Sequence, residues 1–295
     1  MSSWANLRSF KYWLGKKSPM FKNALLQQSS IRPVIMNDLK ITIIQSELFW
    51  EDKQKNLEMF SQKISAVDEP TDLIVLPEMF STGFSMRPDL FSETMDGITI
   101  SWMKATAKEK NAVIAGSFVC ESDGKFLNRF VWMNVDGTYS VYDKRHLFRM
   151  GDEDKHYAAG QNKLIIEFKG WKICPLVCYD LRFPVWARNT KEHMYDVLIY
   201  VANWPEKRAH PWKSLLVARA IENQCFVAGV NRVGNDGNDI YHSGDSVVLD
   251  FKGEPLSKIE SGIETTQTIT LKYSDLEAFR TFFPVMSDAD NFEIR

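Results

Sequence analysis

Short apolar runs alternate with longer segments of helical periodicity from residue 39 onwards. Residues 72–76 (DLIVL) and 196–202 (DVLIYVA) are nearly continuous apolar runs, which is typical of strands buried on both faces. Residues 52–67 carry apolar side chains at helical spacing. Because a strand that is apolar on both faces must be covered by other layers, this alternation predicts an α/β fold in which helices cover sheets.

The same criteria place the remaining elements within one domain. Strands are predicted at residues 40–45, 72–76, 112–118, 130–134, 139–142, 164–168, 172–178, 196–202, 225–230, 246–250 and 266–271, and helices at 52–67, 100–110, 212–223, 274–281 and from about 181. An Asp-Gly dipeptide at 136–137 is typical of a hairpin turn between two of the strands. No repeat, low-complexity tract or Pro/Gly-rich linker follows residue 36, so residues 36–295 are expected to form one domain.

Composition narrows the possible partners and the location. The 36 basic and 38 acidic residues give a net charge of −2, so no overall positive field favours nucleic acid. The longest apolar runs, at 73–77 and 197–202, are far shorter than the roughly 20 residues of a membrane-spanning helix. Four cysteines in 295 residues do not make a disulfide scaffold, which favours a reducing compartment and hence a cytoplasmic location.

The first 35 residues differ from the rest of the chain. They contain six basic residues and no acidic one, and they lack the continuous apolar stretch of a secretory signal. Three interpretations remain open: a basic tail that binds a partner, a misassigned translation start upstream of Met36, or a transit peptide for an organelle. Residues 1–35 are therefore treated as a basic N-terminal extension, separate from the fold prediction.

Three short polar segments directly follow predicted strands, where α/β proteins place functional side chains. The first is residues 76–80 (LPEMF), in which Glu78 lies at the exit of the strand. A carboxylate among Leu76, Met79 and Phe80 would be partly desolvated, which raises its pKa towards the range of a general base. The alternative interpretation is a solvated loop glutamate.

The second segment, residues 142–149 (YDKRHLFR), contains five ionisable side chains besides its first tyrosine. A run of charges is usually a solvated face, but the neighbouring Leu147 and Phe148 indicate that part of this one turns inward. An inward Lys144 could stabilise negative charge that develops during a reaction.

The third segment, residues 173–184 (ICPLVCYDLRFP), places Cys178 between a buried strand and a predicted helix start. That arrangement would expose the thiol beside backbone N–H donors and the positive end of a helix, as in a nucleophile turn. Inert packing is the alternative. Cys174 and Cys178 are four residues apart, which is not the spacing of a zinc site. Asp180 and Arg182 are expected to pair and brace the turn.

Together these segments resemble the nitrilase superfamily of carbon–nitrogen hydrolases. LPEMF at Glu78, YDKRHLF at Lys144 and VCYDLRFP at Cys178 match the three motifs of that family in order, and Glu153 best matches its second, supporting glutamate. The resemblance extends from about residue 39 to about residue 292. It implies a four-layer α-β-β-α sandwich and a Glu-Lys-Cys catalytic set that needs no metal or organic cofactor.

Several stretches are most similar to the bacterial omega-amidase branch of the family, among them PEMFSTGFSM, LVCYDLRFPVWARN, YVANWP and ARAIENQ. Omega-amidases hydrolyse the terminal amide of 2-oxoglutaramate or 2-oxosuccinamate to the diacid and ammonia. A nitrilase, an N-carbamoyl hydrolase and a non-catalytic binding protein of the same fold remain alternatives. A Ser-His-Asp hydrolase is disfavoured because the chain lacks a G-x-S-x-G elbow.

The resemblance also implies a role for each catalytic candidate. Cys178 would form a thioester with the substrate, and Glu78 would move the protons. Lys144 and the backbone N–H of Tyr179 would stabilise the tetrahedral oxyanion. Glu153 would orient Lys144 or the attacking water.

A substrate of this class needs a cation for its free carboxylate and a pocket for its 2-oxo group. Arg149, Lys207 and Arg208 are the open candidates for the cation, whereas Arg182 is expected to pair with Asp180. The predicted substrate-binding residues are Tyr179, Phe84, Arg149, Asn203 and Trp204. Ordinary surface charge or core packing is the alternative for each.

Residues 218–224 (ARAIENQ) lie on the predicted long helix, where Arg219 and Glu222 have the spacing of an intrahelical ion pair. By resemblance, this region and the segment after Cys178 form the helical face of a dimer. A homodimer or larger homo-oligomer is therefore expected.

Overall fold

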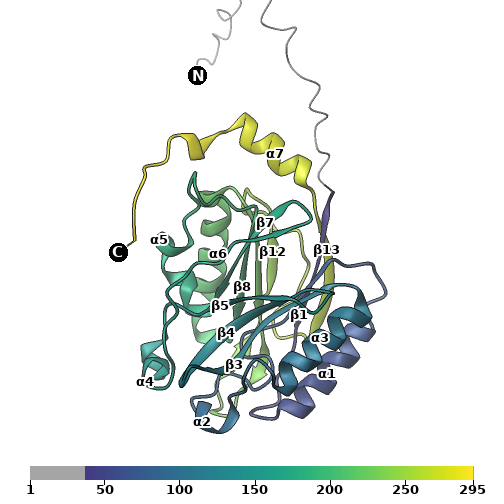
Figure 1. The fold of residues 1–295 in the computed structure, drawn as a ribbon. Helices are drawn as coiled ribbons and strands as arrows, with labels where there is room; N and C mark the ends of the chain where they lie inside the picture. Colours follow the sequence, from purple (N-terminus) through teal and green to yellow (C-terminus); the bar gives the residue numbers. More distant parts are fainter. Residues whose placement is uncertain (1–36, 295) are drawn as a thin grey trace, which may run out of the picture. The chain divides into compact units, whose positions relative to one another are not determined.

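Two β-sheets pack face to face in the computed structural model of the protein, which describes residues 37–294 (Figure 1). The first sheet has the strand order β13-β1-β2-β3-β4-β5, and the second has the order β12-β9-β8-β7-β6. The strands of the first are β1 (Leu39–Gln45), β2 (Leu73–Val75), β3 (Val113–Ser122), β4 (Lys125–Met133), β5 (Tyr139–Asp143) and β13 (Thr265–Leu271). Those of the second are β6 (Ile166–Phe168), β7 (Trp171–Val177), β8 (Val197–Ala202), β9 (Phe226–Asn231) and β12 (Val247–Leu249).

Helices cover the outer face of each sheet (Figure 1). The helices α1 (Lys53–Ser65) and α3 (Ile98–Lys110) share an apolar cluster with the first sheet, and α6 (Ala209–Asn223) packs on the second, next to the short α5 (Pro184–Ala187). The remaining helices are α2 (Pro88–Phe91), α4 (Glu153–His156) and α7 (Tyr273–Phe282). This arrangement confirms the predicted four-layer α-β-β-α sandwich.

The apolar runs of the central strands are explained by burial on both faces. In β2, Leu73 and Val75 pack into the cluster between the two sheets, whereas Ile74 packs into the cluster beneath α1 and α3. All three side chains are fully buried, and each such burial contributes roughly 1.5–3 kcal/mol. The absence of polar alternation in these strands therefore follows from the layered architecture.

The carboxyl ends of four strands bring the polar segments of the sequence together. The strands β1, β2 and β3 run parallel, as do β7, β8 and β9, and β5 runs parallel to β3 because two antiparallel pairings separate them. Glu78 follows β2, Lys144 follows β5, Cys178 follows β7 and Asn203 follows β8. Functional side chains from both sheets are thus gathered at one end of the sandwich.

Most predicted elements are present with boundaries shifted by a few residues. The Asp-Gly turn at 136–137 does connect the antiparallel strands β4 and β5, and Gly137 has a φ of +81°. The prediction of a single helix from about residue 181 is wrong. A 3₁₀ turn spans Cys178–Arg182, and α5 begins only at Pro184, because a residue before proline is disfavoured in helical conformation.

A hairpin of β10 (Val233–Asn235) and β11 (Tyr241–Ser243), which sequence analysis missed, forms a separate two-stranded sheet. Among residues 37–294, no helix combines the length and the apolar character needed to cross a membrane. The basic N-terminal extension, residues 1–35, lies outside the described residues, so its three interpretations stay open.

Candidate active site

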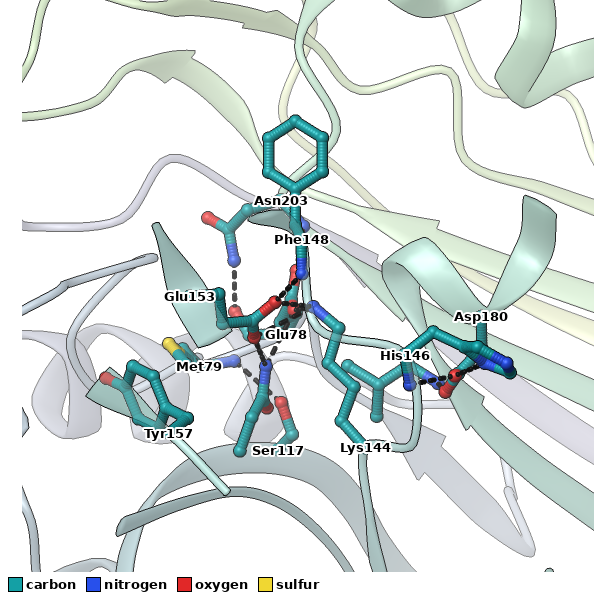
Figure 2. Close-up of polar contacts among 12 residues, drawn as sticks. Glu78, Met79, Ser117, Lys144, His146, Phe148, Glu153, Tyr157, Asp180 and Asn203 are labelled. Carbon is teal, nitrogen blue, oxygen red and sulfur yellow. Dashed lines mark hydrogen bonds and ion pairs between the residues drawn. The ribbon is translucent and has the colours of Figure 1, made fainter. Parts of the chain in front are cut away.

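A buried cluster of one ammonium and two carboxylates lies at the carboxyl ends of the strands (Figure 2). Lys144 Nζ lies 2.9 Å from Glu78 Oε1 and 2.9 Å from Glu153 Oε2, and all three side chains are fully inaccessible to solvent. The predicted inward turn of Lys144 and the predicted burial of Glu78 are therefore both observed. With both carboxyls ionised, the cluster carries one net negative charge.

Each of the two glutamates has a neighbour in left-handed backbone conformation, and the resulting turn directs the carboxylate towards Lys144. Met79, directly after Glu78, has a φ of +43°, and its N–H donates to Ser117 Oγ at 2.9 Å (Figure 2). Asp152, directly before Glu153, has a φ of +59° and precedes α4. Aspartate adopts this conformation more readily than most residues, but methionine rarely does, so the turn at Met79 is held by its surroundings.

Asn128 on β4 joins the two carboxylates, and sequence analysis did not identify it. Its Nδ2 donates to Glu78 Oε1 at 2.8 Å and to Glu153 Oε1 at 3.1 Å. The sequence gives little signal, because Asn128 and Arg129 are two adjacent polar residues within the largely apolar stretch FLNRFVWM. A neutral double donor placed between two carboxylates reduces their mutual repulsion without adding charge.

The pKa values of the cluster follow from its burial and its charges. Burial raises the pKa of Glu153, and the nearby Glu78 carboxylate adds to the rise. Burial alone would lower the pKa of Lys144, but Glu153 and Glu78 outweigh it, so the pKa lies above its usual range. Lys144 is therefore an ammonium throughout the physiological range of pH.

Cys178 begins the 3₁₀ turn after β7 and has a φ of +43°. The sequence predicts an exposed thiol, but the residue is nearly buried, with 9% of its surface exposed. Burial raises the pKa of Cys178 well above its usual range, and the Glu78 carboxylate raises it further. The resting thiol is therefore neutral, and a base must remove its proton before it can act as a nucleophile.

Cys178 opens onto a cavity of about 230 Å³. Four of the five predicted substrate-binding residues line this cavity: Phe84, Tyr179, Asn203 and Trp204. The fifth, Arg149, lies outside the lining, with 86% of its side chain exposed and Asp154 Oδ2 at 3.6 Å from its Nε.

Asn203 also reaches the catalytic cluster. Its backbone N–H donates to Glu78 Oε2 at 2.8 Å, and its Nδ2 donates to the Glu78 carbonyl oxygen at 2.5 Å. Asn203 Oδ1 is buried and has no hydrogen-bond partner among the described residues. The residue thus fixes Glu78 and leaves one acceptor beside the cavity.

Two arginines line the cavity without a carboxylate partner among residues 37–294. The Arg182 guanidinium lies 4.9 Å from the ring centroid of Trp204, and that of Arg208 lies 5.2 Å from the ring centroid of Phe148. The predicted pairing of Arg182 with Asp180 is therefore wrong. Both oxygens of Asp180 are occupied by other donors, which leaves Arg182 free to face the cavity.

Comparison with known proteins identifies the architecture that holds this site. The family model for carbon–nitrogen hydrolases matches residues 40–281, which includes the buried cluster, Cys178 and the arginines. The chain belongs to the carbon–nitrogen hydrolase family. The predicted membership of the nitrilase superfamily is thereby confirmed.

Individual relatives of this hydrolase match it over most of their length. Omega-amidase YafV of Escherichia coli strain K12 is 46% identical over 259 residues, which cover 88% of this chain and 100% of that protein. The 2-oxoglutaramate amidase of Bacillus subtilis strain 168 is 33% identical, with 74% and 85% covered. The crystal structure of XC1258 from Xanthomonas campestris, a CN-hydrolase superfamily protein with an arsenic adduct in the active site, has a TM-score of 0.86 at 43% identity. That match covers 88% of this chain and 100% of the other.

The missed β10–β11 hairpin closes one side of the cavity of this hydrolase. Its contributions to the lining are Asp236, Asn238, Ile240 and His242. His242 is buried, and burial together with the charge of Arg232 lowers its pKa to about 4, so the ring is neutral. Asp236 Oδ1 accepts the N–H groups of Asn238 and Ile240 and shapes the turn. The hairpin therefore adds polar surface but no further cation to the cavity.

Proposed function

We propose that this hydrolase is an omega-amidase, which cleaves the terminal amide of a small 2-oxo dicarboxylic acid monoamide such as 2-oxoglutaramate or 2-oxosuccinamate. The proposal rests on one observation. The small cavity holds Cys178, behind which lie the Glu78 carboxylate and the Lys144 ammonium, together with two arginines that have no carboxylate partner among residues 37–294. The identity to omega-amidase YafV and to a 2-oxoglutaramate amidase supports the same activity.

In the first half of the reaction, the Cys178 sulfur attacks the amide carbon while Glu78 accepts the thiol proton. The tetrahedral intermediate then collapses, the carbon–nitrogen bond breaks, and Glu78 passes the proton to the leaving nitrogen, which departs as ammonia. A thioester on Cys178 remains. Proton transfer in step with attack is consistent with the raised pKa of Cys178, because it avoids a free thiolate in a buried site.

In the second half, water replaces ammonia. Glu78 takes a proton from the water as its oxygen attacks the thioester carbon, and the carbon–sulfur bond breaks. The Cys178 sulfur recovers a proton, and the free acid is released. Glu153 keeps Lys144 charged and in place during both halves through their contact at 2.9 Å.

The oxyanion of each tetrahedral intermediate would be stabilised by two donors. Lys144 supplies a fixed ammonium, and Tyr179 supplies a backbone N–H in the first turn of the 3₁₀ segment, where the amides have no intrahelical partner. A well-placed donor of this kind contributes roughly 3–4 kcal/mol to transition-state stabilisation.

The free carboxylate of the substrate would be bound by Arg182 and Arg208. Each guanidinium lies over an aromatic ring, which orients it and leaves its N–H groups available for a planar, bidentate contact. A cavity of about 230 Å³ is smaller than the roughly 300–1,000 Å³ of pockets for drug-sized ligands, which favours a compact substrate. Arg182 and Arg208 therefore replace Arg149 as the proposed carboxylate-binding residues.

A homo-oligomer in the cytoplasm is the remaining part of the proposal. Val185 on α5 and Ile221 on α6 are about half exposed, at 55% and 51%, on the face that the resemblance assigns to a dimer. The measurement is light scattering coupled to size-exclusion chromatography, in which a Val185→Glu/Ile221→Glu double variant should shift to monomer. A monomeric wild type would refute the oligomer.

The test of the activity is ammonia release from 2-oxoglutaramate, 2-oxosuccinamate, glutamine, a simple nitrile and an N-carbamoyl amino acid. We expect the two 2-oxo amides to be turned over far faster than the others. Activity confined to the nitrile or to the N-carbamoyl compound would move the protein to another branch of the family. Inactivity towards all five would favour a binding protein.

A further inference from the structure

Asp180 is a fully buried carboxylate that the proposed reaction does not use. Its Oδ2 accepts hydrogen bonds from Tyr142 Oη at 2.8 Å and from Val177 N at 3.0 Å. Its Oδ1 accepts from His146 N at 3.0 Å and lies 2.7 Å from His146 Nδ1 (Figure 2). Four polar groups from two separate segments thus converge on one side chain.

The direction of these hydrogen bonds is determined by the chemistry of the groups. Tyr142 Oη already accepts from Trp186 Nε1 at 3.0 Å and from Arg145 N at 3.3 Å, so its own proton points to Asp180. A carboxylate only accepts, and therefore the His146 ring carries a proton on Nδ1. Every neighbour of Asp180 in this set is a donor, and only a carboxylate can satisfy them all.

The donors belong to the two catalytic segments. Tyr142 and His146 lie two residues before and two residues after Lys144, at the end of β5 in the first sheet. Val177 directly precedes Cys178, at the end of β7 in the second sheet. One carboxylate therefore holds the lysine segment of one sheet against the cysteine turn of the other.

The cysteine turn needs such support. Cys178 has a φ of +43°, a conformation that non-glycine residues keep only where the surroundings impose it. The bond from Val177 N to Asp180 fixes the turn on one side, and Arg219 Nη2, which donates to the Leu181 carbonyl at 2.6 Å, fixes it on the other.

We propose that Asp180 is a positioning residue that sets the Lys144 ammonium in register with the Cys178 sulfur. The proposal rests on the proposed catalytic roles of Lys144 and Cys178, but not on the identity of the amide. If the two groups shift relative to one another, the oxyanion is no longer aligned with its donor. Tyr179 and Arg182 lie on the same turn and line the cavity, so substrate binding is also affected, but less than the chemical step.

The decisive variant is Asp180→Asn. An amide has only one acceptor oxygen, whereas each oxygen of Asp180 lies against two donors. The NH₂ group of the asparagine would therefore face two donors whichever oxygen it replaces. We expect kcat to fall about 100-fold, the loss typical of a displacement of about 1 Å in a reacting geometry, and KM to rise by a clearly smaller factor, because Tyr179 and Arg182 on the same turn line the cavity. The pH midpoint of Cys178 alkylation by iodoacetamide, followed by mass spectrometry of its peptide, should move down towards the range of an ordinary thiol, because water reaches the loosened turn.

Asp143→Asn is the matched control. Asp143 directly precedes Lys144 and pairs with Arg129, with Oδ1 at 2.6 Å from Nε and Oδ2 at 2.9 Å from Nη2, but makes no hydrogen bond to the cysteine turn. Its removal should change kcat less than about twofold and leave the alkylation midpoint unmoved.

The outcomes separate this proposal from others. A folded Asp180→Asn variant with wild-type kcat and alkylation midpoint would overturn it, and so would a loss that appears only in thermal stability. If Asp180→Asn does not fold, His146→Phe decides, because it keeps the stack on Phe183 and removes only the ring donor. We then expect kcat to fall about tenfold at unchanged KM, and an unchanged kcat would refute the proposal. If the wild type hydrolyses no amide, the proposed function fails, but the alkylation midpoints still test Asp180.

Discussion

The two ends of the cavity use their charges in opposite ways. Behind Cys178 at one end lie the buried side chains of Glu78, Lys144 and Glu153, here called the floor. They are outside the cavity lining, and the ammonium lies 2.9 Å from each carboxylate. At the other end, the wall formed by Arg182 and Arg208 has cations whose neighbours are aromatic rings, with no carboxylate partner in the described part of the chain.

This difference shows which charges are available to a ligand. A charge that is paired and desolvated inside the protein is fixed in place, which suits a group that must stabilise a transition state. A guanidinium on an aromatic face keeps its N–H edge unsatisfied, which suits a group that must bind an anion. Floor and wall should therefore respond differently to mutation, in kcat and in KM respectively.

The largest effect is expected from Cys178→Ala, which removes the nucleophile above the floor. Turnover of 2-oxoglutaramate should fall by at least about 10⁴-fold, because no thioester can form. The melting temperature should change little, since only one sulfur atom is lost. Cys120→Ala is the control, because Cys120 is buried on β3 away from the cavity lining and should leave kcat within about twofold. Residual activity near wild type in Cys178→Ala would exclude the proposed mechanism.

A smaller effect on the floor is expected from Glu153→Gln. We expect kcat to fall roughly 10²–10³-fold, as for the loss of one electrostatic group. Because the pKa of Glu153 is raised, the wild-type carboxylate is protonated at a higher pH than an ordinary carboxyl group as the solution is acidified. The acid limb of kcat/KM should therefore move to lower pH in the variant. Identical pH–rate profiles for wild type and variant would show that Glu153 does not control this limb.

Substitution of the wall arginines should mainly raise KM. Arg182→Met and Arg208→Met each remove a charged hydrogen bond worth about 1.5–3 kcal/mol, so kcat/KM for 2-oxoglutaramate should fall roughly 10–100-fold. Most of the loss should appear as a raised KM. A neutral amide without a carboxylate should be hydrolysed as by the wild type. Equal losses on both substrates would assign the arginines to packing instead.

The smallest effect is expected from Arg149→Met. Arg149 carries the same charge near the same loop, but it is exposed and lies outside the cavity lining. Its kcat/KM for 2-oxoglutaramate should stay within about twofold of wild type, as for other surface charges. A tenfold rise in KM would show that Arg149 binds the substrate although it lies outside the cavity lining, and the assignment of binding to Arg182 and Arg208 alone would be wrong.

The sequence allowed the floor to be predicted better than the wall. Glu78 and Cys178 each follow a short apolar run whose length and flanking residues indicate a buried strand, so their positions at strand ends could be predicted from the local sequence. The family resemblance then related Lys144 and Glu153 to them. The layered fold followed from the same runs, because strands apolar on both faces require cover on both sides.

The remaining features depend on contacts between distant segments. The pairing of Asp180 with Arg182 was inferred from their closeness in sequence, but donors from residues 142 and 146 occupy the carboxylate instead. Asn128 carries no motif, and only its contacts with both carboxylates reveal its part in the site. The burial of Cys178 likewise depends on segments distant in the sequence, among them those of Glu78 and Lys144, which local sequence does not specify.

The excess negative charge of the floor also bears on what happens after chemistry. In the proposed reaction the substrate arrives with a neutral amide towards Cys178, but the product has a second carboxylate at that position. This new anion forms next to a cluster of two carboxylates and one ammonium whose net charge is −1, so the net interaction with the cluster is repulsive. In the proposed reaction, this repulsion would favour release of the product over resynthesis of the amide.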